Sequence, residues 1–230
     1  GGDFMESYEE NAIHSVDENS ILTNTFFRMF LGLLASAGAA LYAYYSGMAE
    51  SMIYGRGYLT LAIVEIIIVL LFSFLFKKLS PTMVTVLFFA YAFVNGFTLS
   101  VIFFAYEMTS IVYAFFGTAA LFGILAFVGY KTEKDISKFG TILGVSLLVG
   151  LILTIINIFI GSSFLDIVLD WAMLFIFCGL TVYDMNKIKE MQNMGFCEDE
   201  KLYVYGAMEL YLDFINIFLR ILSLFAKRRD

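Results

Sequence analysis

The sequence predicts an all-α integral membrane protein with seven transmembrane helices, six of them surrounding a central C-terminal helix. Of the 230 residues, 60% are hydrophobic and 15% are charged, and the mean hydropathy is +0.84. A water-soluble core cannot absorb that much apolar surface. Seven apolar stretches are long enough to cross a bilayer, and the last of them carries its polar residues along one stripe.

Each predicted helix meets the length that a bilayer requires. A hydrocarbon core of about 30 Å takes about 20 residues of helix, and every backbone polar group must be satisfied within that helix. In chain order the stretches are residues 25–46, 58–76, 82–106, 111–130, 139–161, 167–184 and 202–225. We therefore expect a single membrane domain at residues 23–230, preceded by a polar N-terminal tail at residues 1–22.

Lysines in alternate connections predict the orientation. They follow the second, fourth and sixth stretches: Lys77, Lys78, Lys131, Lys134, Lys138, Lys187, Lys189 and Lys201. Because cytoplasmic loops are enriched in Lys and Arg, we expect the N-terminus in the cytoplasm. The short loops favour the bacterial plasma membrane, with an endomembrane as the alternative. Seven crossings place the basic residues 227–229 outside, against this rule, so a last stretch that enters only halfway is the alternative.

Charged side chains within the apolar stretches are the first candidates for function. Five of them stand out: Glu65, Asp184, Glu209, Asp213 and Arg220. Each costs about 2.5–3.5 kcal/mol at the centre of a membrane helix, so each needs a partner, a cavity or a neutralising proton. Glu209 and Asp213 share i, i+4, i+7, i+11 spacing with Asn216 and Arg220, which places all four on one narrow stripe. The last helix should therefore face the bundle interior.

Asp184 and Asp213 could form one site. Asp184 is near the cytoplasmic end of the sixth stretch, whereas Asp213 is about 16 Å along the seventh, so they meet only if helix boundaries or tilts absorb that difference. Two carboxylates in a low-dielectric site would share one proton, which makes the pair a proton sensor. Carboxylate oxygens also suit Ca²⁺, and we expect transient Ca²⁺ contacts at Asp184, Asp213 and Glu65. The predicted ion pathway is lined by Glu65, Glu209 and Asn216.

A structural role is the alternative for the same residues. Asp213 with Arg220 or Asn216 could form a buried polar clasp that fixes helix packing. Asp184 could lie at the membrane interface beside the lysines at positions 187 and 189. The residue pattern alone leaves both interpretations open.

Enzymatic and nucleic-acid-binding functions are not expected. The only histidine, His14, lies in the tail, which argues against serine–histidine and zinc-protease schemes. An intramembrane aspartyl protease would need Gly-x-Gly before Asp213 and a Pro-Ala-Leu segment, but residues 210–212 are Leu-Tyr-Leu and Pro81 is the only proline. The net charge of −7 gives no sign of nucleic-acid binding. We expect no enzyme activity and no resident cofactor.

Two C-terminal segments resemble the signatures of the Bax inhibitor-1 family. They are GLTVYDMNKIK at residues 179–189 and LYLDFINIFL at residues 210–219. The resemblance extends more weakly through residues 25–40, Glu65 and residues 95–99. It implies a bacterial member with seven helices, the last enclosed by the other six, that leaks Ca²⁺ in a pH-dependent way. It also implies that Asp184 and Asp213 are the paired-aspartate sensor and that Glu65 takes part in ion passage.

The chain departs from the family pattern at one position. The bacterial members resembled here carry a latch arginine toward the end of the second helix, where this chain has Phe76. The cations that could replace the latch are Lys77, Lys78 and Arg220, although a lysine lacks the planar fork of arginine. Some relatives act by binding other membrane proteins, including a membrane-bound AAA protease. Regulatory binding through the acidic tail and residues 190–201 is therefore the alternative function.

Overall fold

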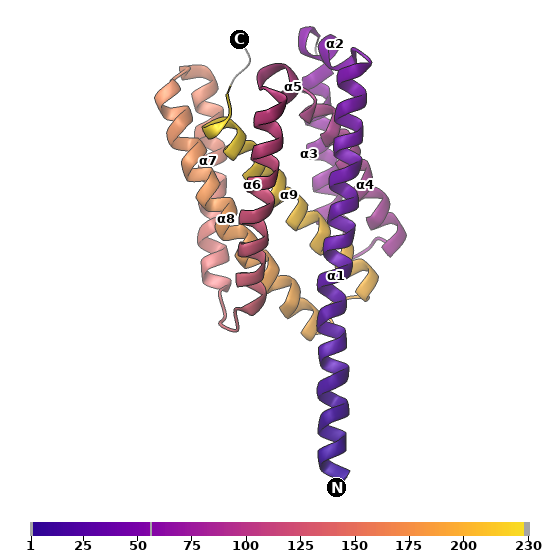
Figure 1. The fold of residues 1–230 in the computed structure, drawn as a ribbon. Coiled ribbons are helices and arrows are strands. Elements are labelled where there is room, and N and C mark those ends of the chain that lie inside the picture. Colours follow the sequence, from indigo (N-terminus) through magenta and orange to yellow (C-terminus); the bar gives the residue numbers. More distant parts are fainter. Residues whose placement is uncertain (1, 56, 228–230) are drawn as a thin grey trace.

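The computed structural model describes residues 2–55 and 57–227, which fold as a helical bundle (Figure 1). These residues form nine helices and no strands: α1 (Gly2–Tyr45), α2 (Met48–Tyr54), α3 (Gly57–Leu75), α4 (Pro81–Leu99), α5 (Ile102–Ala105), α6 (Met108–Lys131), α7 (Ser137–Ile160), α8 (Ser163–Asn193) and α9 (Asp199–Phe225). The short helices α2 and α5 lie at the end of the bundle away from the N-terminus (Figure 1). The predicted all-α class is confirmed.

Five stretches in the described residues are long and apolar enough to cross a membrane. They are Ser20–Tyr45, Pro81–Ala105, Met108–Lys131, Ser137–Ile160 and Ser163–Asn193. The apolar part of α3, Thr60–Leu75, is shorter, and α9 carries charged residues along its length. Large apolar side chains such as Phe159 and Phe164 are exposed on the outside of the bundle. A surface of this kind belongs in lipid, so the chain is an integral membrane protein.

The boundaries of the last two helices differ from the predicted ones. The sixth stretch was expected to end at Asp184, but α8 continues to Asn193 and α9 already begins at Asp199. The added part of α8 is about two and a half turns long. Its polar side chains are satisfied by α6, because Asn186 Nδ2 donates to Thr132 O at 2.7 Å and Lys189 Nζ donates to Tyr130 O at 2.9 Å. These bonds occupy carbonyls at the C-terminal end of α6.

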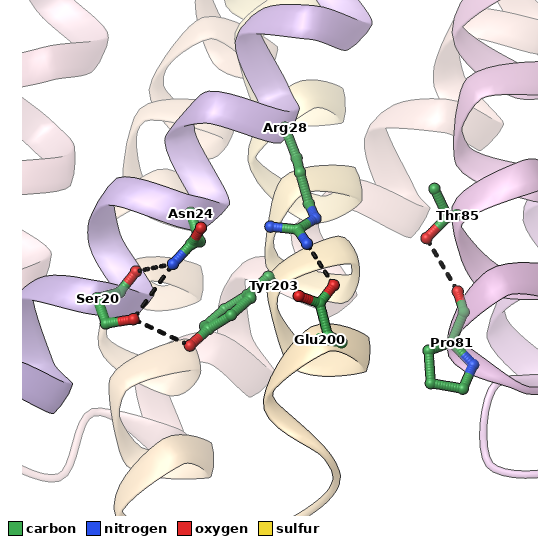
Figure 2. A network of polar contacts seen from close by, with 7 residues as sticks. All are labelled: Ser20, Asn24, Arg28, Pro81, Thr85, Glu200 and Tyr203. Atoms are coloured by element: carbon green, nitrogen blue, oxygen red, sulfur yellow. Dashed lines mark hydrogen bonds and ion pairs between the residues drawn. The ribbon is translucent and has the colours of Figure 1, made fainter.

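The N-terminal region is helical from Gly2 on. Helix α1 begins at Gly2, so residues 2–22 of the predicted polar tail form its first turns. Figure 1 shows this part of α1 extending beyond the other helices. Where α1 enters the bundle it is tied to the start of α9 (Figure 2): Arg28 pairs with Glu200, and the Ser20 and Tyr203 hydroxyls are 3.1 Å apart.

Helix α9 is the most buried of the long helices. It packs against α1, α4, α6 and α8, and the Tyr205 ring also contacts Phe72 and Phe76 at the end of α3. Next to it, α1 and α4 approach closely at Gly96. A Cβ atom at this position would lie 2.4 Å from the backbone oxygen of Ser36. The approach is therefore open to glycine alone, and it brings the two helices together on one side of α9.

Candidate functional site

The buried carboxyl groups of Asp184 and Asp213 form the centre of the candidate site. Asp184 lies on α8 and Asp213 on α9, with 7% and 3% of their surfaces exposed. The two carboxyl groups are neighbours and act on one another electrostatically. The extension of α8 beyond Asp184 makes this contact possible, because it brings Asp184 to the depth of Asp213. The structure thus brings together the two residues whose meeting the sequence left open.

The surroundings of the pair offer Asp213 few donors. The hydroxyl of Thr181, one turn before Asp184, lies near the Asp213 carboxyl, but it donates its hydrogen bond to Phe177 O at 2.9 Å. The buried Oδ2 atom of Asp213 has no hydrogen-bond partner among the described residues. A buried carboxylate oxygen without a donor is costly, and a proton held between the two acids would remove part of that cost.

A lysine and a tyrosine complete the polar group on one side. Lys187 Nζ donates to the Tyr205 hydroxyl at 2.7 Å and acts electrostatically on Asp184. Tyr205 lies near Glu209, whose charge acts on both aspartates. The site therefore contains three carboxyl groups and one ammonium group. Lys187 was considered in the sequence only as an interfacial neighbour of Asp184, and Tyr205 was missed because a tyrosine in an apolar helix carries no distinct signal.

The cations proposed for the latch lie elsewhere. Lys77 Nζ is 5.3 Å from the centre of the Phe196 ring, and Lys78 is exposed at the end of α3. Phe76, at the latch position, is buried against the Tyr205 ring at 5.0 Å between centroids. Within the described part of the chain, the lysine that acts on Asp184 is thus Lys187, which reaches the site from α8 itself.

Arg220 and Asn216 do not clasp Asp213. Arg220 Nη1 forms an ion pair with Asp170 Oδ1 at 2.6 Å, and Ser223 donates to the other Asp170 oxygen at 2.6 Å. Asn216 Nδ2 donates to Leu212 O within α9 at 2.8 Å. The expected clasp is therefore absent from the described contacts of these side chains. Asp170, which the sequence analysis overlooked, is the partner that makes Arg220 tolerable between apolar helices.

Glu65 belongs to a second polar network on the other side of α9. It accepts hydrogen bonds from Thr98 and from Asn95 Nδ2, the latter at 3.3 Å. Asn95 Oδ1 accepts from the Tyr211 hydroxyl at 2.9 Å, and that hydroxyl is 2.6 Å from Ser36 Oγ. The network joins α1, α3, α4 and α9. Tyr211 and Asp213 are two residues apart and so point to opposite sides of the helix.

The three carboxylates expected to contact Ca²⁺ are divided between these two networks. Asp184 and Asp213 lie between α8 and α9, whereas Glu65 is bonded to α4. Over the residues that the structure describes, no group of three or more His, Cys, Asp or Glu side chains is arranged to hold a metal ion.

Comparison with known proteins identifies the family. The family described as inhibitor of apoptosis-promoting Bax1 matches residues 18–230, which include both signature segments and the aspartate pair. The chain belongs to the Bax inhibitor-1 family. The resemblance stated from the two C-terminal segments is therefore confirmed, and the family match covers all the helices of the bundle apart from the first turns of α1.

Bacterial relatives of this Bax inhibitor-1 family chain match over most of their length. Inner membrane protein YbhL of Escherichia coli K12 is 36% identical over 207 residues, which cover 87% of this chain and 88% of the relative. An uncharacterized protein of Borreliella burgdorferi is 33% identical over 218 residues, covering 93% and 94%. One from Deinococcus radiodurans is 32% identical over 208 residues, covering 89% of each. The name of the first agrees with an integral membrane location.

Proposed function

We propose that this protein is a pH-sensitive Ca²⁺ leak channel in which the Asp184–Asp213 pair is the proton-controlled gate. The observation that carries the proposal is the contact of two buried carboxyl groups across α8 and α9, in which Oδ2 of Asp213 has no donor among the described residues. Gain or loss of a shared proton changes the charge at this helix contact by one unit. In a low-dielectric interior, that change is large enough to alter how the two helices pack.

The proposed channel crosses the membrane seven times with α9 at its centre. The continuous α9, 27 residues long, supports a full last crossing over a half-inserted one. Its burial and its contacts with α1, α3, α4, α6 and α8 support a central position. The lysines of alternate connections support a cytoplasmic N-terminus, in a bacterial plasma membrane. In this arrangement the aspartate pair lies in the half of the bundle nearer the cytoplasm.

The proposed ion pathway follows the polar side chains of α9. Glu209 lies beside the aspartate pair, Asn216 lies further along the helix, and Glu65 lies across α9 from the pair. Acidic oxygens along a pathway favour cations over anions, and dispersed single carboxylates allow Ca²⁺ to leave again. No catalytic step is part of this proposal.

Ca²⁺ flux into dye-loaded proteoliposomes tests the function. Flux is measured between about pH 6 and 8 for the unmodified protein and for Asp184→Asn and Asp213→Asn. Asp135→Asn is the matched control, because Asp135 lies exposed in the connection between α6 and α7. We expect the pH midpoint to move or vanish in the two site variants and to be unchanged in the control. Flux no higher than in empty liposomes at any pH would reject the channel, as would unchanged pH dependence in both site variants.

Regulatory binding to another membrane protein, such as a membrane-bound AAA protease, is the second candidate. The extension of α1 beyond the bundle favours it, since a projecting helix is accessible to a partner (Figure 1). Removal of residues 2–19 separates the two functions. A deletion variant that keeps Ca²⁺ flux in proteoliposomes but loses the protein's effect in cells supports binding to a partner. Loss of flux in the same variant ties this segment to the channel.

A further inference from the structure

We infer that the groove between α1 and α6 binds one acyl chain of an anionic phospholipid, whose headgroup is held by Lys131. The groove has a volume of about 330 Å³ and is lined by Leu22, Thr23 and Phe26 of α1 and by Gly123, Ala126, Phe127 and Tyr130 of α6. Its size is near the lower end of small-molecule pockets, about 300–1,000 Å³. This site is independent of the proposed channel function, because it requires only that the bundle lies in a membrane.

The groove lies at the level where lipid headgroups begin. The apolar stretch of α1 starts at Ser20 and that of α6 ends at Lys131, and the lining residues occupy these same ends. Tyr130 contributes a phenol ring to the rim, a residue type that is enriched at the membrane interface. The groove walls are apolar and face outward into lipid, so a hydrocarbon chain is the occupant that fits their chemistry.

Charge selects the kind of lipid. Lys131 Nζ lies 5.9 Å from the centre of the Phe127 ring and 5.7 Å from that of Tyr130, so the ammonium group stands over two residues that line the groove. In the described portion of the chain Lys131 takes part in no ion pair. Lys189, which also faces Tyr130, donates instead to the backbone carbonyls of Tyr130 and Thr132. Basic pockets between transmembrane helices are suited to acidic lipid headgroups.

Gly123 keeps the groove open. A Cβ atom at this position would meet nothing within 4 Å, so a side chain added here starts in open space at the groove wall. Gly117, six positions earlier on α6, is also exposed and equally free of neighbours, but it does not line the groove. Gly123→Leu and Gly117→Leu therefore form a matched pair: both replace an exposed helical glycine, and only one blocks the proposed site.

Lipid retention measures the site directly. The purified full-length protein in detergent is mixed with phosphatidylglycerol or phosphatidylcholine of identical chains, and bound lipid is counted by native mass spectrometry. We expect the unmodified protein and Gly117→Leu to retain one phosphatidylglycerol in preference to phosphatidylcholine. Gly123→Leu should weaken that binding about tenfold, the effect of losing contact with about two methylene groups. Lys131→Gln should remove the preference for phosphatidylglycerol while the acyl chain still binds.

The outcomes that overturn the inference are equally specific. Equal retention of the two lipids by the unmodified protein would show only the nonselective lipid layer around any membrane protein. Retention by Gly123→Leu equal to that of Gly117→Leu would place the bound lipid elsewhere. The thermal unfolding midpoint of each variant is measured without added lipid as a control for folding. Lipid retention by Gly123→Leu is compared with that of Gly117→Leu when the two midpoints are equal, and Lys131→Gln tests the site in either case.

Discussion

At the scale of single residues, the charge of Lys187 acts on Asp184 of the pair. This side chain reaches the site from α8, donates to Tyr205, and is the lysine that acts on Asp184. A nearby positive charge favours ionised carboxylates. We therefore predict that Lys187→Met shifts the pH midpoint of Ca²⁺ flux upward, whereas Lys187→Arg leaves it near that of the unmodified protein. A midpoint in Lys187→Met that stays fixed or moves downward would show that Lys187 serves only to position Tyr205.

The ion pair between Arg220 and Asp170 should stabilise the fold without gating it. Both side chains are partly exposed, at 25% and 14%, so the cost of Asp170→Ala should be about 1–3 kcal/mol, below the cost of breaking a fully buried pair. The thermal unfolding midpoint in detergent measures this. The double change Asp170→Ala with Arg220→Met should recover most of the loss, because it no longer leaves an unpaired guanidinium. A pH midpoint of flux that moves in Asp170→Ala would contradict the separation of this pair from the gate.

Much of the site was predictable at this scale, and the reasons for the misses are physical. The cost of a charge in a membrane helix identified Asp184, Asp213 and Glu65 as needing partners. In the structure Glu65 receives hydrogen bonds from Thr98 and Asn95, and the two aspartates lie next to one another. The same reasoning could not say which partners. Arg220 was expected to lie on one stripe with Asp213. The two residues are seven positions apart, which is about 10 Å along the helix axis. Asp170 of α8 is the carboxylate that lies level with Arg220 and pairs with it.

At the scale of the helices, the contact of α1 with α4 is a close backbone approach beside α9. Replacing Gly96 by Ala would place a methyl group 2.4 Å from Ser36 O, so α1 must move outward. We predict a loss of about 1–3 kcal/mol, seen as a lower thermal unfolding midpoint in detergent. Gly38→Ala on α1 is the control, since a Cβ there meets nothing within 4 Å. Equal midpoints for the two variants would mean that this approach is loose in solution.

Helix existence was easier to predict from the sequence than helix ends. Each predicted apolar stretch corresponds to one long helix, or to α4 with α5 in the third case, because hydrophobic length alone defines a membrane helix. The end of α8 was placed too early because hydropathy falls after Asp184. The chain remains helical there since Asn186 and Lys189 find acceptors at the end of α6. Partners on another helix are not visible in the sequence of this one.

At the scale of the whole molecule, the two free cysteines allow the seven crossings to be tested. Cys197 lies in the connection between α8 and α9, and Cys178 lies within α8. In a Cys178→Ser background, a membrane-impermeant maleimide should label Cys197 from the cytoplasmic side only. With Cys197→Ser added, Lys227→Cys should be labelled only from outside. Labelling of both positions from the same side would favour a half-inserted last helix.

The pH of this labelling experiment matters. Burial is the main cause that raises the pKa of the Cys197 thiol, so less thiolate is present at neutral pH than in an exposed cysteine. Labelling at about pH 8.5, near the ordinary thiol pKa, keeps the reaction fast enough to compare the two sides. The comparison between sides is unaffected, because the same thiol is labelled in both.

The central claim is that Asp184 and Asp213 share a proton whose loss or gain controls the channel. Infrared difference spectroscopy of the reconstituted protein, titrated with pH, observes a protonated carboxyl group directly. We predict a protonated carboxyl band that disappears as pH rises, and the pH midpoint of this loss should equal the pH midpoint of Ca²⁺ flux. In Asp213→Asn the band should be absent or displaced. A band that is unchanged in Asp213→Asn, or whose midpoint differs from that of the flux, would contradict the account.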